Sequence, residues 1–220
     1  MTHLYLVPHW FFIYSIIFEA IFAIASGLIS YFSFKVYNLS KQKESKWFGA
    51  GFFLISVSYV IWLIINLCLL RDNTQAVGSI NLEQIVFWWT FAIYSHLILF
   101  VTGVITLICS HFKKNKLKLF ALLEVISLVS IYLSCNKGLS FYVISSIFLA
   151  YLAIIYFLQY LKKRKFNSFL SMIAFILLFI SHVQFILASN NYLYYVFGHI
   201  VEFMGYLLLI SQLIIILKHG

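Results

Sequence analysis

Ionisable side chains inside long apolar stretches are the residues of this sequence whose types and spacing could carry out chemistry. Three of its six acidic residues lie in such stretches: Glu19, Glu124 and Glu202. Three of its seven histidines do so as well: His96, His182 and His199. A charged group within a membrane is costly, so each of these residues is a functional candidate by default.

The last apolar stretch contains two of these candidates on one face. His199 and Glu202 are one helical turn apart and therefore point the same way. With Tyr195 and Tyr206 they form a stripe whose spacing is typical of the face that a helix turns toward its bundle. The pattern predicts a helix from residue 192 to 217 that packs against other helices along this stripe.

Imidazole and carboxylate groups together suit a zinc, copper or iron ion. A cation would also neutralise carboxylates that are otherwise costly to bury, and a pair of histidines from facing helices can ligate haem b. We expect a metal ion or haem at His96, His182 and His199, with Glu19 and Glu202 as ligands or neighbours. The expected supporting residues are Tyr195, Tyr206 and Ser95.

A bound metal with an open coordination position would favour hydrolysis of a lipid, whereas haem would favour electron transfer. No catalytic residue is identified by the sequence. The alternative is a non-enzymatic, receptor-like or sensory membrane module with a buried polar pocket. In that case the same residues form a proton relay or a ligand pocket, or act as hydrogen-bonded packing groups between helices.

The elements that position these residues follow from composition. The chain has 220 residues, of which 64% are hydrophobic and 10% charged, whereas a soluble domain is roughly half apolar and a quarter charged. At about 20 residues per membrane helix, this length suits about seven spans. We therefore expect an all-α, polytopic membrane protein formed by one seven-helix bundle over residues 1–220. The predicted spans are 8–36, 47–70, 84–111, 117–134, 139–161, 166–189 and 192–217.

The basic residues indicate how the bundle is oriented. Thirteen of the fifteen Lys and Arg residues fall on one side of the predicted spans, and only Arg71 and Lys137 fall on the other. Short cytoplasmic loops are enriched in Lys and Arg, so the N-terminus is predicted outside and the C-terminus in the cytoplasm. We expect a multi-pass protein of the cell membrane. The net charge of +9 is a topology signal, so the expected partners are the lipid bilayer and other membrane proteins, with no nucleic acid.

The predicted orientation gives each candidate a depth. At 1.5 Å per residue, Glu19, His96 and Glu202 lie roughly 15–18 Å below the outer surface, and His182 and His199 lie roughly 10 Å below it. The last two are each seven residues from the same short turn and should be at equal height. These five residues therefore share one layer, contributed by the first, third, sixth and seventh spans, whereas the remaining intramembrane glutamate lies near the inner end of the fourth span.

Two known classes of seven-span protein are similar to this chain in layout. In rhodopsins retinal is attached to a lysine in the middle of the last span, and here that span has no lysine before Lys218. Zinc hydrolases of the alkaline ceramidase and adiponectin receptor type have H-x-x-x-H in the last span, where this sequence has H-x-x-E. No functional residue is therefore carried over from either class.

Overall fold

A computed structural model of the chain describes residues 12–75, 82–112, 116–188 and 191–219. The described residues form helices and contain no strand, so the predicted all-α fold is confirmed. The helices are α1 (Phe12–Ser40), α2 (Lys43–Gln75), α3 (Leu82–Ser110), α4 (Lys116–Leu133), α5 (Lys137–Lys163), α6 (Phe166–Leu187) and α7 (Leu193–His219). Residues 8–11 of the first predicted span and the end of the sixth, at 189, lie outside the described residues.

Each predicted span corresponds to one helix, with the largest difference at α2. This helix continues to Gln75 rather than ending at residue 70, because helical hydrogen bonding extends past the apolar segment. In the described part of the chain, six helices are long and apolar enough to span a membrane, one fewer than predicted. The exception is α4, which has 18 residues and contains Lys116, Lys118 and Glu124.

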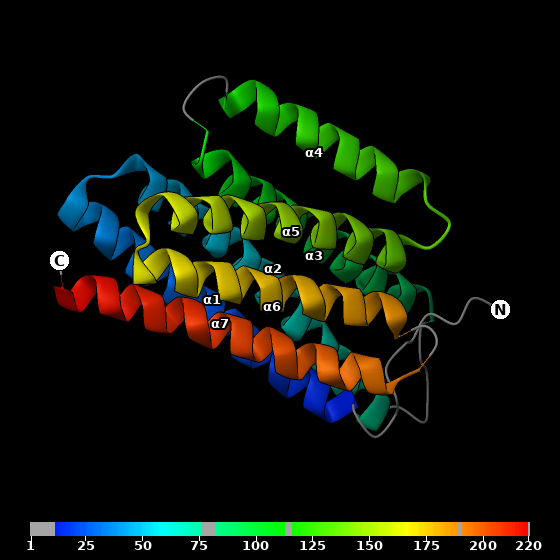
Figure 1. Cartoon of the computed structure of the whole chain (residues 1–220). Coiled ribbons are helices and arrows are strands. Elements are labelled where there is room, and N and C mark those ends of the chain that lie inside the picture. Colours follow the sequence, from blue (N-terminus) through cyan, green and yellow to red (C-terminus); the bar gives the residue numbers. More distant parts are fainter. Residues whose placement is uncertain (1–11, 76–81, 113–115, 189–190, 220) are drawn as a thin grey trace.

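Six helices form a closed ring, and the seventh lies outside it. Going around the ring, the neighbours are α1, α2, α3, α5, α6 and α7, and α7 returns to α1. Figure 1 shows α4 outermost, over α3 and α5, and its contacts with these two helices are about as limited as the contact between α3 and α5, the least extensive in the ring. α4 therefore differs from the six ring helices both in its composition and in its position in the bundle.

Glycines allow a close approach between helices of the ring. A Cβ atom on Gly51 of α2 would lie 2.8 Å from the carbonyl oxygen of Gly103 on α3, and the reverse pair is equally close. On α7, a Cβ at Gly205 would lie 2.9 Å from the side chain of Leu178. Small residues permit this close approach of membrane helices, and α4 has no glycine.

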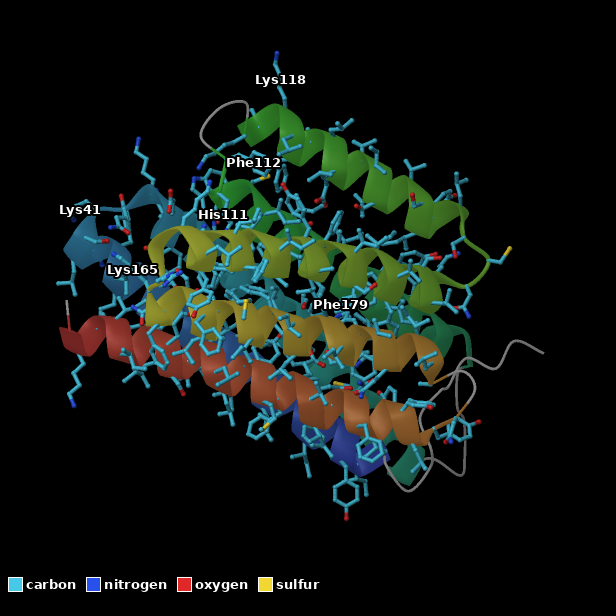
Figure 2. All side chains as sticks on the ribbon, viewed as in Figure 1. Lys41, His111, Phe112, Lys118, Lys165 and Phe179 are labelled. Carbon is cyan, nitrogen blue, oxygen red and sulfur yellow. The ribbon has the colours of Figure 1, made fainter. Side chains whose placement is uncertain are left out.

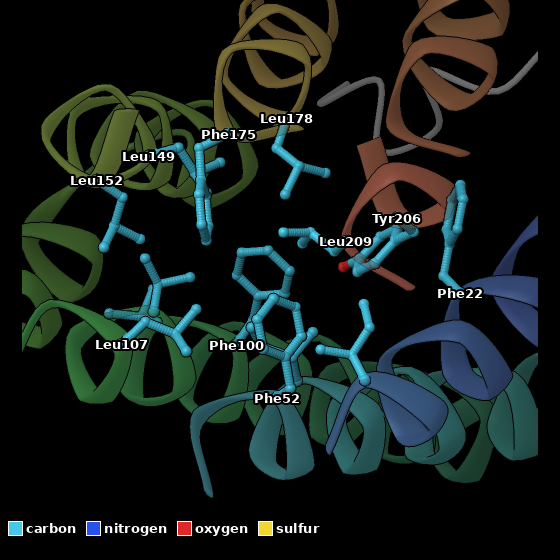
Figure 3. Packing of buried hydrophobic residues seen from close by; sticks show 14 of the residues in the cluster. Phe22, Phe52, Phe100, Leu107, Leu149, Leu152, Phe175, Leu178, Tyr206 and Leu209 are labelled. Atoms are coloured by element: carbon cyan, nitrogen blue, oxygen red, sulfur yellow. The ribbon is translucent and has the colours of Figure 1, made fainter. Parts of the chain in front are cut away.

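The centre of the ring is filled by large apolar side chains. Figure 3 shows this core, to which all six ring helices contribute: Phe22, Phe52, Phe100, Leu107, Leu149, Leu152, Phe175, Leu178, Tyr206 and Leu209. Tyr206, an expected supporting residue of the candidate site, belongs to this core.

Basic side chains gather at the end of the bundle where α7 ends. Lys41, Lys118 and Lys165 all lie at this end in Figure 2, together with His111. This clustering agrees with the basic loops that the sequence places on one side of the spans. The opposite end of the bundle, where α1 begins, is called the predicted outer end below.

Candidate functional site

The predicted stripe on α7 faces the bundle. His199, Glu202 and Tyr206 are buried, and Tyr195 is half-buried. Between them, Gly198 and Gly205 are also buried. The spacing of these residues therefore predicted the inward face of this helix correctly.

Glu202 is held by a tyrosine from α2. The hydroxyl of Tyr59 donates to Oε1 of Glu202 over 2.6 Å. The hydroxyl of Tyr59 is also hydrogen-bonded with that of Tyr206, one turn along α7. A short chain of hydroxyl groups therefore leads to a carboxyl group that is 2% exposed.

Glu19 is held by two further donors from α2. The indole Nε1 of Trp62 donates to Oε1 over 2.8 Å, and the amide Nδ2 of Asn66 donates to Oε2 over 3.0 Å. The two donors are four residues apart, so they lie on one face of the helix. The carboxyl group of Glu19 is 6% exposed, and it fastens α1 to α2.

His96 packs against two of the three α2 residues that bind the carboxyl groups. Its ring centroid is 5.2 Å from that of Tyr59 and 5.5 Å from that of Trp62. His96 is hydrogen-bonded with the main chain of Ser58, and its Nδ1 has no hydrogen-bond partner among the described residues. His96 is therefore linked to the carboxyl groups of Glu202 and Glu19 indirectly, by its contacts with Tyr59 and Trp62.

His182 has a defined tautomer and lies on a small cavity. Its Nδ1 is 3.0 Å from the carbonyl oxygen of Leu178. Because a carbonyl group can only accept, Nδ1 carries the proton and Nε2 is left as an acceptor. Glu202 and Tyr206 line the same cavity, whose volume is about 10 Å³. This volume is close to the minimum for one water molecule.

His199 sits among aromatic rings from three helices. Phe18 and Phe22 of α1 stack on it at 5.5 and 5.7 Å, and Tyr195 meets it edge-on at 4.6 Å. Phe185 of α6 contacts both His199, at 5.0 Å, and His182, at 5.9 Å. The two histidines predicted at equal height therefore share this phenyl ring as a neighbour.

Phenyl rings also join the third histidine to this group. The ring of Phe100 is 5.9 Å from His96 and 5.5 Å from His182. All five predicted residues thus belong to one connected set of contacts, the polar cluster, which comprises Glu19, Tyr59, Trp62, Asn66, His96, His182, His199, Glu202 and Tyr206. Ser95 is half-buried on α3.

The polar cluster as folded does not match a metal site. Within the described ranges, no three His, Cys, Asp or Glu side chains lie close enough together to hold a metal ion. The physical reason is visible in the contacts, because the carboxyl oxygens face donors from α2 and the histidines face phenyl rings. A cavity of about 10 Å³ beside Glu202 is also far too small for a haem, so either cofactor would require these side chains to rearrange.

Sequence reasoning assigned no role to α2. Tyr59, Trp62 and Asn66 supply the hydrogen bonds to both buried carboxyl groups. The available signal was their spacing of three and seven residues along one face of an apolar helix, with a side-chain donor at each position. The remaining candidate glutamate, Glu124 on α4, is separate from the cluster, and its Oε1 lies 2.6 Å from the hydroxyl of Thr102 on α3.

Cys68 and Cys135 are exposed free thiols, and Cys109 is a buried one. No protein family model matches this chain. Neither the curated proteins nor the solved structures contain a match to it.

Proposed function

We propose that this protein is a non-enzymatic, receptor-like or sensory module of the cell membrane, in which the polar cluster responds to protons. The observation that carries the proposal is that both buried carboxyl groups are held by uncharged donors of one helix, α2. Gain or loss of a proton at either group changes a hydrogen bond that fastens α2 to α1 or to α7. A ligand shifts the equilibrium between two states of a protein only if it interacts differently with each state, and here the ligand is the proton.

The two carboxyl groups differ in how they tolerate a proton. Trp62 can only donate, so a proton on Oε1 of Glu19 would face another donor. A proton on Oε2 finds an acceptor when the Asn66 amide turns its oxygen toward Glu19. Protonation of Glu19 is therefore coupled to a discrete change in the contact between α1 and α2.

Glu202 is adaptable, because the hydroxyl of Tyr59 can donate to a carboxylate or accept from a carboxylic acid. It also lines the small cavity with His182, whose Nε2 is an acceptor. One water molecule in that cavity would connect the two ionisable groups. Glu19 is thus the proposed switch, and Glu202 with His182 is the proposed site of proton exchange.

The size of the cavity supports a proton as the signal. With about 10 Å³ available, nothing larger than a water molecule reaches Glu202 unless the helices move apart. The output would be a change in the packing of α2, which a partner protein in the same membrane could sense.

The competing proposal is a cofactor protein, in which a metal ion or haem b binds His96, His182 and His199, with Glu19 and Glu202 beside them. It is favoured by the five ionisable residues that share one buried set of contacts, and it needs a rearrangement of the cluster. Metal content and an absorption spectrum of the purified protein distinguish the two proposals. A Soret band, or a stoichiometric metal ion that is lost in His199→Ala, would replace the proton-sensing proposal.

The decisive experiment measures hydrogen–deuterium exchange along α2 in lipid vesicles as the pH is lowered. After correction for the pH dependence of the intrinsic amide exchange rate, we expect exchange around residues 59–66 to increase on acidification in the wild type and to be insensitive to pH in Glu19→Gln. Glu124→Gln is the matched control, because it removes a hydrogen-bonded carboxyl group of another helix outside the cluster and should respond like the wild type.

Two results would overturn the proposal. One is corrected exchange that does not change with pH in the wild type, which would leave the carboxyl groups with a packing role alone. The other is an unchanged pH response in the Glu19→Gln/Glu202→Gln double variant, which would place the responsive group elsewhere.

A further inference from the structure

An apolar groove of about 310 Å³ lies between α3 and α4, outside the ring. It is lined by Tyr94, Leu97, Ile98, Leu128, Val129, Ile131 and Tyr132. Its volume is at the lower end of the range for ligand pockets, roughly 300–1,000 Å³. Its lining provides no charged group, so an occupant of this groove is held by apolar contact.

The side chains of the groove do not suit another helix. Membrane helices pack through small residues that let their backbones approach, as Gly51 and Gly103 do between α2 and α3. The groove has no glycine, alanine or serine in its lining. Its lining consists of large side chains instead, which keep a second helix backbone at a distance but can contact a thin and flexible apolar chain.

The groove opens toward the lipid. Val129 is 49% exposed and Ile98 is 41% exposed, and α4 is the outermost helix in Figure 1. Tyr132 is 73% exposed and lies next to the last residue of α4. Tyrosine is typical of the level of the lipid headgroups, where its ring is in apolar surroundings and its hydroxyl is in contact with water.

A polar contact lies one turn beyond the lining of the groove on both helices. Thr102 and Glu124 are each four residues deeper than Ile98 and Leu128 of the lining, and their side chains are joined over 2.6 Å. The lining of the groove on α4 runs from Leu128 to Tyr132, which is four residues or about 6 Å along the helix axis. In the predicted orientation the groove therefore lies at the outer end of α4, next to the headgroup level.

We propose that this groove binds one acyl chain of a phospholipid from the leaflet at the predicted outer end, wedged between α3 and α4. The acyl chain enters the groove beside Tyr132. Its methylene groups supply contacts to α4 where side chains of the ring do not reach it. The proposal is independent of the proposed proton response. It explains why α4 can stand apart from the ring without leaving an empty space in the membrane.

Native mass spectrometry of protein released from nanodiscs of palmitoyl-oleoyl phosphatidylcholine tests this site. The filling variant is Val129→Trp, and the matched control is Val125→Trp, one turn away on the same helix and 60% exposed. We expect one phosphatidylcholine retained per wild-type chain, the same in the control, and retention lower by about tenfold or more in the filling variant. Ile98→Trp fills the groove from α3 and should reproduce the loss.

Equal lipid retention by Val129→Trp and Val125→Trp would overturn the proposal, as would a wild type that retains none. A dimer that dissociates in Val129→Trp would also overturn it, because the groove would then be an interface between two copies. Thermal melting of the variants identifies misfolding, and loss of lipid from both filling variants at wild-type melting temperature supports the site.

Discussion

Removing the hydroxyl group of Tyr59 separates hydrogen bonding from packing in the polar cluster. Tyr59→Phe keeps the ring, and with it the contacts to His96 and Phe22 at 5.2 and 5.6 Å. It deletes the bond to Glu202 at 2.6 Å and the bond with Tyr206. Hydrogen bonds between membrane helices contribute about 0.6 kcal/mol on average and up to about 1.7 kcal/mol. Losing two should therefore destabilise the protein by about 1–3 kcal/mol.

The assay is unfolding in mixed micelles titrated with dodecyl sulfate, and the control is Tyr31→Phe. Tyr31 is 62% exposed on α1, so the control removes a hydroxyl group that faces lipid. A double-mutant cycle with Glu202→Leu then isolates the pair, and we expect a coupling of about 1 kcal/mol, within the range for side chains in contact. If Tyr59→Phe stays within about 0.5 kcal/mol of Tyr31→Phe, the tie between α2 and α7 has no energetic weight and the reasoning fails.

Three further predictions concern packing, pH and topology. Gly103→Ala should destabilise the bundle by about 1–3 kcal/mol through overpacking against α2, whereas Gly138→Ala, where the nearest atom to a new Cβ is 3.8 Å away, should be neutral or stabilising in the same unfolding assay. Burial lowers the pKa of His111, just past the end of the α3 span, so the unfolded chain binds the proton more readily than the folded one. The free energy of unfolding should therefore fall as the pH drops through the unfolded value near 6.5, and His111→Asn should flatten that part of the pH–stability curve. Equal curves for the wild type and His111→Asn would contradict this prediction. In a background without Cys68, Cys109 and Cys135, a cysteine at position 74 should react with an impermeant reagent added to intact cells and one at position 114 should not, whereas equal labelling of the two would refute the predicted orientation.

The helices were predictable from the sequence because the apolar stretches are long and are separated by short polar turns. The basic run 162–165 lies at the boundary between α5 and α6, which begins at Phe166. Asn191 lies just before α7, which begins at Leu193. The exclusion of α4 from the ring was harder to predict. Its charges and its lack of glycine are visible in the sequence, but its loose packing depends on the shape of its neighbours.

The common neighbourhood of the candidate residues was also predictable, since depth follows from position along a helix. Their detailed contacts were not. The spacing of Tyr59 and Trp62 shows that they share one face of α2, but in a helix that is hydrophobic on most sides it does not show which neighbouring helices that face contacts. Selecting residues by charge also passed over Asn66, whose neutral amide is a partner of Glu19.

The contact between Phe185 and Gly198 has a consequence for how this sequence can vary. A Cβ atom at Gly198 would lie 2.5 Å from Cε1 of the Phe185 ring, so the two positions share a fixed volume. Gly198→Ala alone should displace the ring that touches His182 and His199, and Phe185→Leu alone should leave a void. Together the two changes should largely compensate. In homologous chains, a larger residue at position 198 should therefore occur together with a smaller residue at position 185. Such paired substitutions would identify the homologues that keep the packing around His182 and His199.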